Sequence, residues 1–268
     1  LMELQKSQRY LLIIEYDGTP FVGWQKQDEG LAVQEALETA VKRYCGETVR
    51  VQGCGRTDSG VHAIAMPAHV DLKTPTDPYR LTAALNACLR PHSIAVLKVI
   101  PVPDTVHARF SCYERRYTYR LLNRRSIATY DRNKVWVVHP DLNTDLMKLA
   151  AEKLVGEHDF STFRAAACQA KSPVKTLDEL RLEVEPLAYG GQAITFHLRA
   201  PSFLHNQVRA MVGSLVKVGR GQWSLDDFQA AMDARDRTRG GQNAPPHGLY
   251  FTSGHFPDLD LGTHLPLT

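Results

Sequence analysis

The sequence lacks the patterns that most directly indicate a metal, a disulfide framework or a nucleotide cofactor. Its five cysteines are an odd number spread along the chain, and no two of them form a Cys-x-x-Cys pair. This spacing favours neither a disulfide-stabilised secreted protein nor a zinc site, so we expect no metal and a reducing, cytoplasmic location. No glycine-rich stretch has the spacing of a dinucleotide fingerprint or a phosphate loop, so we expect no nucleotide cofactor.

Long apolar runs and a strong overall charge are also missing. The apolar start at residues 11–14 is far too short to cross a bilayer and no signal-peptide pattern precedes it, so we expect no membrane association. The net charge is only +3 in 268 residues, which by itself indicates no partner. With 43% hydrophobic residues the chain is neither disordered nor fibrous, and it can bury one large core or two modest ones.

One segment is strongly basic. Residues 109–134 hold eight arginines and lysines against two acidic residues, a local charge of +6, and Tyr113, Tyr117 and Tyr119 lie among the arginines. Basic groups interleaved with aromatic rings suit a polyanion that carries stackable bases. A solvated strand face is the alternative, but lysine and glutamate would then normally accompany the arginines. We therefore expect RNA or DNA to bind here, with Arg115, Arg116 and Arg120 among the contacts.

Hydrophobic periodicity predicts an α+β fold. In the first half, the expected elements are a strand at 9–16, a helix from 33 that ends at Gly46, strands at 48–52 and 68–72, a helix at 81–89 and a strand at 94–100. The order β-α-β-β-α-β is that of a ferredoxin-like unit, an antiparallel sheet with two helices on one face. The open face of such a sheet often binds RNA, although a fold alone establishes no function.

The second half repeats this content less regularly. Strands are expected near 114–122, 134–138, 177–185, 193–199 and 248–252, and helices near 144–155, 206–218 and 225–234. We therefore predict two domains, residues 1–108 and 109–268. Each is expected to have an antiparallel sheet with helices on one face, like a ferredoxin or an RNA-recognition module, and an RNA cleft is expected between them.

A glycine-rich loop surrounds one carboxylate. In "VQGCGRTDSGVHA", residues 51–63, Asp58 lies among three glycines with Arg56 and His62 nearby. Glycines permit sharp turns and close approach to a ligand. Most aspartates in such loops serve turn chemistry, because the side chain accepts hydrogen bonds from the backbone two residues on. The loop alone favours that structural interpretation.

Two further residues are open to more than one interpretation. In "RRYTYRLL" the period of two places Tyr117, Tyr119 and Leu121 on one side of a strand, and periodicity cannot separate a buried tyrosine from one that faces a ligand. Arg209 lies at the edge of the apolar stripe of the helix at 206–218. It either extends into water, which is the commoner case, or points inward and needs an anion, most naturally a buried carboxylate.

Six blocks of sequence, in order, resemble the TruA family of tRNA pseudouridine synthases. They are "YDGTPFVGWQ" (16–25), "GCGRTDSGVHA" (53–63), "ARFSCYERRYTYR" (108–120), "HDFSTFR" (158–164), "FLHNQVRAMVGSLVKVG" (203–219) and "APPHGLYF" (244–251). The resemblance runs from about residue 9 to 252. The one departure is Met66-Pro67 in "AMPAHVDL", where a Gln-Val is typical, and we expect it to affect the start of that strand.

The resemblance implies a chemistry for Asp58. The family breaks the bond between N1 of uridine and the ribose, turns the base, and joins C5 to the same carbon. A carboxylate can trap the sugar C1′ or the base C6 as a nucleophile, or it can abstract a proton to give a glycal, and the sequence leaves these open. No external reagent is consumed, which agrees with the expectation of no cofactor.

The resemblance also assigns roles to three more residues and a quaternary state. Arg209 is expected to pair with Asp58, Tyr117 to stack on the target base and to act as general base, and Arg56 to occupy the space left by the extruded uridine. The implied enzyme is a homodimeric isomerase that acts on uridines 38–40 in the anticodon arm of tRNA. Shape and phosphate recognition are expected to dominate, because uridines in different contexts must be accepted.

Two other classes of protein are alternatives. A non-catalytic RNA-binding protein with two RNA-recognition modules would carry the aromatic-rich signature Lys/Arg-Gly-Phe/Tyr-Gly/Ala-Phe, which is absent. A tRNA methyltransferase would carry a glycine-rich nucleotide loop at the end of a strand, and none is found. Pseudouridine formation in unmodified tRNA without additives separates all three.

Overall fold

The computed structural model describes residues 7–262 and divides the chain into two compact units. Unit 1 contains the chain up to Tyr113 together with the residues from Tyr250 onward, and unit 2 is Glu114–Leu249. The expected domains, 1–108 and 109–268, differ from these units mainly at the C-terminal end, because the residues from Tyr250 onward, which include most of the last strand, belong to unit 1.

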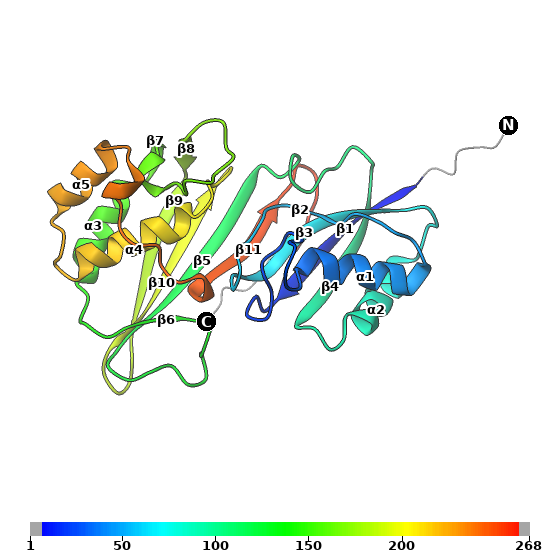
Figure 1. Cartoon of the computed structure of the whole chain (residues 1–268), viewed down its shortest axis with the longest axis horizontal. Coiled ribbons are helices and arrows are strands. Elements are labelled where there is room, and N and C mark those ends of the chain that lie inside the picture. Colours follow the sequence, from blue (N-terminus) through cyan, green and yellow to red (C-terminus); the bar gives the residue numbers. More distant parts are fainter. Residues whose placement is uncertain (1–6, 263–268) are drawn as a thin grey trace. The chain divides into compact units, whose positions relative to one another are not determined.

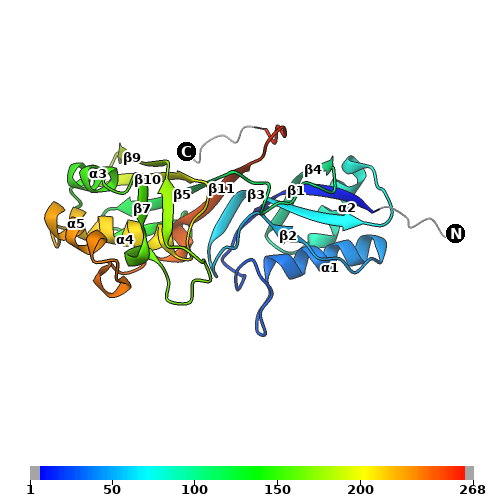
Figure 2. The same cartoon turned by 90° about the horizontal axis from the view of Figure 1, so that it is seen from above.

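Unit 1 has the expected order of elements. They are β1 (Gln8–Tyr16), α1 (Val33–Cys45), β2 (Gln52–Gly53), β3 (His62–Leu72), α2 (Pro78–Leu89), β4 (Ile94–Val102) and, from the end of the chain, β11 (Leu249–His255). The strand order is β4-β1-β3-β11, with β2 also paired to β3. Helices α1 and α2 pack against each other on one face of this sheet (Figure 2). An antiparallel sheet was expected; this one is mixed, because β11 runs parallel to β3.

Capping residues explain the helix bounds of unit 1. The Asp77 side chain accepts a hydrogen bond from the Arg80 N–H, and Pro78 occupies the first turn of α2, where its missing N–H costs nothing. Helix α1 ends at Gly46, whose φ of 77° is the left-handed conformation that favours glycine. The predicted stop at Gly46 is therefore confirmed.

The strand expected at 48–52 is nearly absent, because side chains of α1 bind its backbone. The Val51 N–H donates to the Glu38 carboxylate at 3.0 Å, and the Gln34 side-chain amide donates to the Val51 carbonyl at 3.0 Å. These bonds replace strand pairing, so β2 is only two residues long. An apolar alternation in sequence does not reveal that a neighbouring helix will take the hydrogen bonds.

The Met66-Pro67 departure lies inside β3, which begins at His62 rather than near residue 68. Pro67 faces Ile13 of β1, and its carbonyl accepts the Cys54 N–H at 2.8 Å. In an antiparallel strand the N–H and C=O of one residue point to the same side. The missing N–H of Pro67 therefore lies on the side away from β1, and β3 continues through Met66-Pro67 without a break.

Unit 2 contains the expected helices and strands and adds two short strands, β7 and β8. Its elements are β5 (Glu114–Asn123), β6 (Trp136–Val138), α3 (Thr144–Glu152), β7 (Gly156–Asp159), β8 (Val174–Leu177), β9 (Glu179–Pro186), β10 (Gln192–Ala200), α4 (Gln207–Gly219) and α5 (Leu225–Asp233). Strands β5, β10 and β9 are antiparallel neighbours, β6 runs parallel to β5, and β7 pairs with β8. The three helices pack against one another (Figure 1). This sheet is mixed as well.

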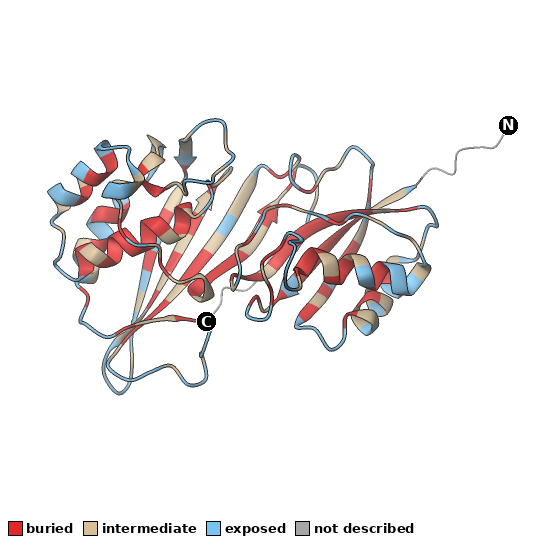
Figure 3. Ribbon diagram, in the orientation of Figure 1, coloured by how far each residue is buried: buried red, intermediate tan, exposed pale blue. Residues whose placement is uncertain are grey.

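Buried residues concentrate on the strands of each unit and on the helix faces turned toward them (Figure 3). The apolar stripe predicted for α4 is confirmed, since all four of its members are buried: Val208, Met211, Val212 and Leu215. In unit 1 the sheet face at Leu11 of β1 and Val102 of β4 is not open, because Ala108, Val106, Leu259 and Leu261 pack against it. An exposed RNA-binding face is therefore absent at this part of the sheet.

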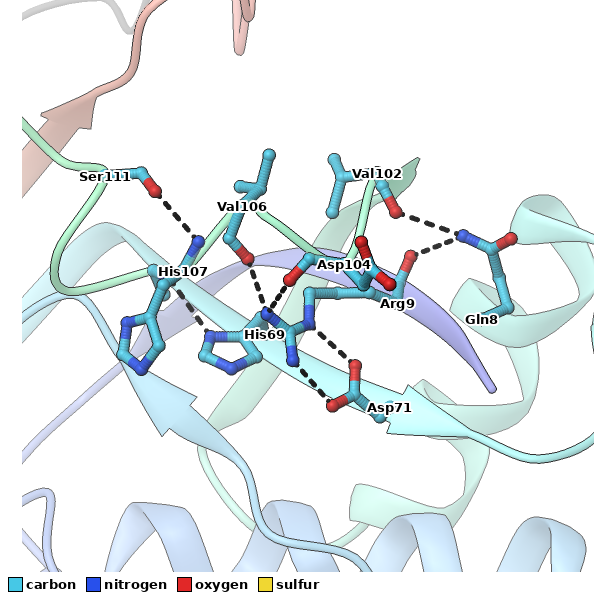
Figure 4. A network of polar contacts seen from close by, with 10 residues as sticks. Gln8, Arg9, His69, Asp71, Val102, Asp104, Val106, His107 and Ser111 are labelled. Atoms are coloured by element: carbon cyan, nitrogen blue, oxygen red, sulfur yellow. Dashed lines mark hydrogen bonds and ion pairs between the residues drawn. The ribbon is translucent and has the colours of Figure 1, made fainter. Parts of the chain in front are cut away.

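A polar network ties the segment after β4 to this covered face (Figure 4). Arg9 makes two bonds to the Asp71 carboxylate, at 2.7 and 2.8 Å, and this contact holds the pKa of Asp71 below its usual value. His69 Nδ1 accepts the Ala108 N–H at 3.1 Å, so the ring is neutral with its proton on Nε2. Burial, with the nearby Arg9 charge, lowers the pKa of His69 to about 4.

This lowered pKa predicts a loss of stability in mild acid. The unfolded chain takes up a proton at position 69 below its ordinary pKa of 6.5, whereas the folded chain resists protonation down to about 4. The free energy of unfolding should therefore fall by up to about 1.4 kcal/mol per pH unit across this window. The contribution of Asp71 is lost only below its ordinary value of 3.8, outside the window. Urea unfolding at several pH values measures this.

The variant His69→Asn is the control for this effect, because it keeps an acceptor near the Nδ1 position and removes the titrating group. Its unfolding free energy should vary less between pH 6.5 and 4 than that of the natural protein. Parallel pH dependences would show that His69 does not carry the effect.

Candidate active site

The loop that carries Asp58 is held in place at Thr57, the residue before it. The buried hydroxyls of Tyr16 and Thr57 lie 2.8 Å apart, and burial raises the pKa of Tyr16 above its usual value. The Thr57 carbonyl accepts the Trp24 N–H at 3.0 Å, and Asp58 forms a bridge with Gly23. Asp58 itself is partly exposed. The backbone on either side of the carboxylate is therefore fixed while the residue remains accessible.

The glycines of this region serve close packing between two chain segments. A side chain at Gly18 would meet the Val61 carbonyl oxygen at 2.0 Å, and one at Gly53 would meet the Trp24 ring at 2.6 Å. Gly23 has a φ of 115°, a conformation that other residues rarely adopt. The blocks 16–25 and 53–63 thus interlock, and the two sequence motifs form one structural feature.

His62 contributes to the same feature. The Gly18 N–H lies 2.9 Å from His62 Nδ1, and an Asp17 carboxylate oxygen lies 3.1 Å from the same nitrogen. A backbone N–H can only donate, so Nδ1 is the acceptor and does not form an ion pair with Asp17. The buried ring stacks on Tyr250 with centroids 4.8 Å apart. Its role here is structural.

In unit 2, Arg209 and Tyr119 hold the segment before β11. Arg209 Nε donates to the Ala244 carbonyl at 2.8 Å, and its Nη1 donates to the Asn206 side chain at 3.1 Å. The Tyr119 hydroxyl donates to the Pro245 carbonyl at 2.8 Å. Tyr119 is fully buried, as the structural alternative for this tyrosine predicts. Arg209 points into the protein rather than extending into water.

Tyr117 lies on β5 and is partly exposed, unlike Tyr119. Its ring packs edge-on against Phe203, with centroids 5.0 Å apart and an interplanar angle of 82°. A tyrosine held on one side by an aromatic ring and partly open on the other suits stacking against a base. Phe203 was not singled out from the sequence, although its place in the block 203–219 could have indicated it.

The arginines of the basic segment differ in their surroundings. Arg116 binds Glu114 at 2.8 Å, Arg115 donates to the Pro201 carbonyl at 2.5 Å, and Arg120 lies 3.7 Å from Asp131. Part of the positive charge of this segment is therefore paired with carboxylates of the same segment. These pairs were not predicted from the sequence. Arg125 and Arg132 are exposed.

The candidate residues fall on both units. Asp58 and the exposed Arg56 belong to unit 1, and Tyr117, Arg209 and the basic residues from Arg115 onward belong to unit 2. Within residues 7–262 no group of three or more His, Cys, Asp or Glu side chains gathers as a metal site. No helix in the same range is long and apolar enough to cross a membrane.

A family profile described as tRNA pseudouridine synthase matches residues 12–111 and 150–257. The chain belongs to the tRNA pseudouridine synthase family. The matched ranges contain Asp58, Arg56 and Arg209, whereas Tyr117 and most of the basic segment fall between them. Enzymes of this family are isomerases that convert uridine to pseudouridine in tRNA.

Relatives of this tRNA pseudouridine synthase align over nearly all of the chain. A protein of Rhodospirillum centenum named tRNA pseudouridine synthase A is 52% identical over 93% of this chain and 100% of its own length. Proteins with the same name from Rhodopseudomonas palustris and Parvibaculum lavamentivorans are 55% and 50% identical, over 90% of this chain and 97% and 96% of theirs. A solved structure of an unknown protein from Galdieria sulphuraria covers 81% of this chain and 94% of its own, at 12% identity and a TM-score of 0.23, too low to inform the fold.

The bond between Tyr16 and Thr57 predicts a selective loss of activity. Tyr16→Phe removes one of two buried hydroxyls and leaves the other without this partner, so the free energy of unfolding should fall by about 1 to 3 kcal/mol. Because Thr57 precedes Asp58, the rate of pseudouridine formation should fall as well. Thermal unfolding and turnover on tRNA measure the two effects.

Tyr10→Phe is the matched control, since Tyr10 lies on the same strand and its hydroxyl binds the backbone of Thr76 instead. It should lose comparable stability and keep its turnover. Equal losses of turnover in both variants would contradict a specific role for the Thr57 contact.

Proposed function

We propose that this enzyme modifies uridines 38–40 in the anticodon arm of tRNA, with Asp58 as the catalytic carboxylate. The observation that carries the proposal is the Asp58 loop: its backbone is fixed at Thr57 and Gly23 while the aspartate stays partly exposed. A preorganised, accessible carboxylate is what a nucleophile on an extruded nucleotide requires. The family resemblance supplies the location in the tRNA.

The reaction needs one bond broken and one formed at the same sugar carbon. The bond from N1 to C1′ breaks, the base turns, C5 joins C1′, and the proton on C5 leaves while N1 gains one. Asp58 acts by attack on C1′ or C6, or by abstracting a proton to give a glycal. In each case the carboxylate is released at the end, so the enzyme is unchanged.

Three further residues complete the proposal. Arg56, exposed two positions before Asp58, occupies the space of the extruded uridine. Tyr117 stacks on the target base and removes the C5 proton. Arg209 serves as counter-ion of Asp58. A guanidinium has five N–H donors and can bind several acceptors at once, so this role is compatible with the bonds of Arg209 to Ala244 and Asn206.

We also propose an oligomeric state, a location and a tRNA-binding surface for this enzyme. The enzyme acts as a homodimer in the cytoplasm, without a nucleotide cofactor, and binds tRNA through arginines of the segment 109–134. Arg115, Arg116 and Arg120 are included, with Arg116 exchanging its contact with Glu114 for a phosphate. The tRNA binds in a cleft between a domain of residues 1–108 and a domain of residues 109–268.

Asp58→Asn tests the central assignment. Asparagine keeps the size and turn preference of the residue but removes the nucleophile, so pseudouridine formation should become undetectable while tRNA binding changes little. Tritium release from tRNA labelled at C5 of uridine, with carbodiimide labelling of the product, measures formation. Asp28→Asn, at an exposed carboxylate of the same unit, should stay fully active. Survival of activity in Asp58→Asn would support a turn residue instead.

Tyr117→Phe tests the general base. The ring and its contact with Phe203 remain, so tRNA binding should persist, whereas turnover should fall about 100- to 10,000-fold if the hydroxyl transfers the proton. A deuterium isotope effect at C5 should increase, because proton removal then limits the rate. The control is Tyr130→Phe, at a fully exposed tyrosine. Unchanged turnover and isotope effect in Tyr117→Phe would limit Tyr117 to packing.

A further inference from the structure

An exposed turn of unit 1, residues 107–111, presents an aromatic ring beside a guanidinium. Phe110 is 77% exposed, the largest fraction for any phenylalanine in the described residues. The Arg109 guanidinium carbon lies 5.6 Å from the centre of the Phe110 ring, and the His107 imidazole lies 4.4 Å from it at an interplanar angle of 35°. The ring is therefore supported by an imidazole while most of its surface faces solvent.

The turn closes on itself through its own polar groups. His107 Nδ1 accepts the N–H groups of Arg109 at 3.1 Å and Phe110 at 3.3 Å. The His107 N–H donates to the Ser111 hydroxyl at 2.9 Å, and the Ser111 N–H donates to the His107 carbonyl at 2.9 Å. These four hydrogen bonds of the turn are made by backbone groups and by the side chains of His107 and Ser111.

The polar network of Figure 4 anchors this turn to the sheet. The Ala108 N–H donates to the buried His69, whose ring packs edge-on against His107 with centroids 4.5 Å apart. Arg9, held by Asp71, donates to the carbonyls of Asp104 at 2.6 Å and Val106 at 2.9 Å, just before the turn. Two strands of the sheet therefore fix the position of the turn, and the proposed catalytic roles use none of these residues.

A single exposed apolar side chain is common on protein surfaces and by itself indicates nothing. Tyr79, which is 83% exposed on α2, is such a case. Phe110 differs because an imidazole supports its ring, a guanidinium flanks it, and a network of hydrogen bonds holds its backbone. Neither Phe110 nor Arg109 contributes core packing that would explain this support.

We propose that Phe110 and Arg109 form a stacking platform for an unpaired base of the tRNA, away from the reacting uridine. An aromatic face stacks on any base, and a guanidinium adds attraction for the phosphate or for the base plane. The occupant is RNA rather than protein because the flanking charge is positive and the ring is the only apolar group of the turn that is highly exposed. This proposal rests on tRNA being the substrate.

Equilibrium binding of unmodified tRNA tests the platform. Phe110→Ala should weaken binding about 5- to 100-fold with an unchanged dependence on salt, because stacking releases no counterions. Arg109→Ala should weaken binding and reduce the magnitude of the salt slope by about 0.7 to 0.9 if the guanidinium contacts a phosphate. Phe110→Trp should keep the natural affinity for tRNA, because the aromatic face remains. The fluorescence of the new tryptophan should be quenched when tRNA binds.

Two control variants separate stacking from general surface effects. Phe110→Leu keeps apolar area without an aromatic face, so it should bind nearly as weakly as Phe110→Ala. Tyr79→Ala removes an equally exposed ring elsewhere in unit 1 and should bind within twofold of the natural protein. Natural affinity in Phe110→Ala, natural affinity in Phe110→Leu, or an equal loss in Tyr79→Ala would each overturn the platform.

The outcomes for the platform and for the proposed function can be told apart. If the natural enzyme binds tRNA but forms no pseudouridine in it, the proposed function fails while the binding series still decides the platform. If the natural enzyme is active and Phe110→Ala binds normally, only the platform fails. Folding of Phe110→Ala is checked by thermal unfolding, and the fluorescence of Phe110→Trp gives an independent answer if the alanine variant does not fold.

Discussion

The hydrogen bonds at Thr57 are the contacts on which the Asp58 loop depends. A hydroxyl from β1 and a backbone N–H from the following loop bind the same residue, so two chain segments are joined next to the carboxylate. The Tyr16 and Thr57 hydroxyls are buried, where an unpaired polar group is costly, and this makes their contact strongly favoured. The aspartate is therefore placed by the backbone before any partner of its side chain is considered.

In unit 2, Arg209 holds a neighbouring chain segment in addition to its proposed catalytic role. Its guanidinium and its own carbonyl both bind Ala244, and Tyr119 binds the next residue, so the segment 244–245 is held from two sides. Gly248 follows closely, and a side chain there would meet the Tyr119 ring at 2.6 Å. The sequence block 244–251 is thus tied to β5 and α4 by specific contacts rather than by general burial.

Periodicity and caps predicted most helices and strands because these are local properties. The end of α1 at Gly46 was predicted from a residue of the segment itself, whereas α2 was expected from residue 81 and begins three residues earlier, at Pro78. The larger errors were not local. The strand expected at 48–52 was lost to side chains of α1. The sheet of unit 1 became mixed because β11, from the end of the chain, joined it in parallel, and that of unit 2 because β6, the next strand after β5, pairs with β5 in parallel.

The sequence by itself determined the family and the order of most elements, because six ordered motifs and the spacing of apolar residues are written along the chain. The proposal of Asp58 as the catalytic carboxylate also comes from these motifs. Only the tertiary structure decided which neighbours those motifs have. It joined the blocks 16–25 and 53–63 at Thr57, buried Tyr119 while leaving Tyr117 partly exposed, and paired Arg116 with Glu114. The physical reason is that burial and hydrogen-bond partners depend on segments distant in sequence, and periodicity carries no information about them.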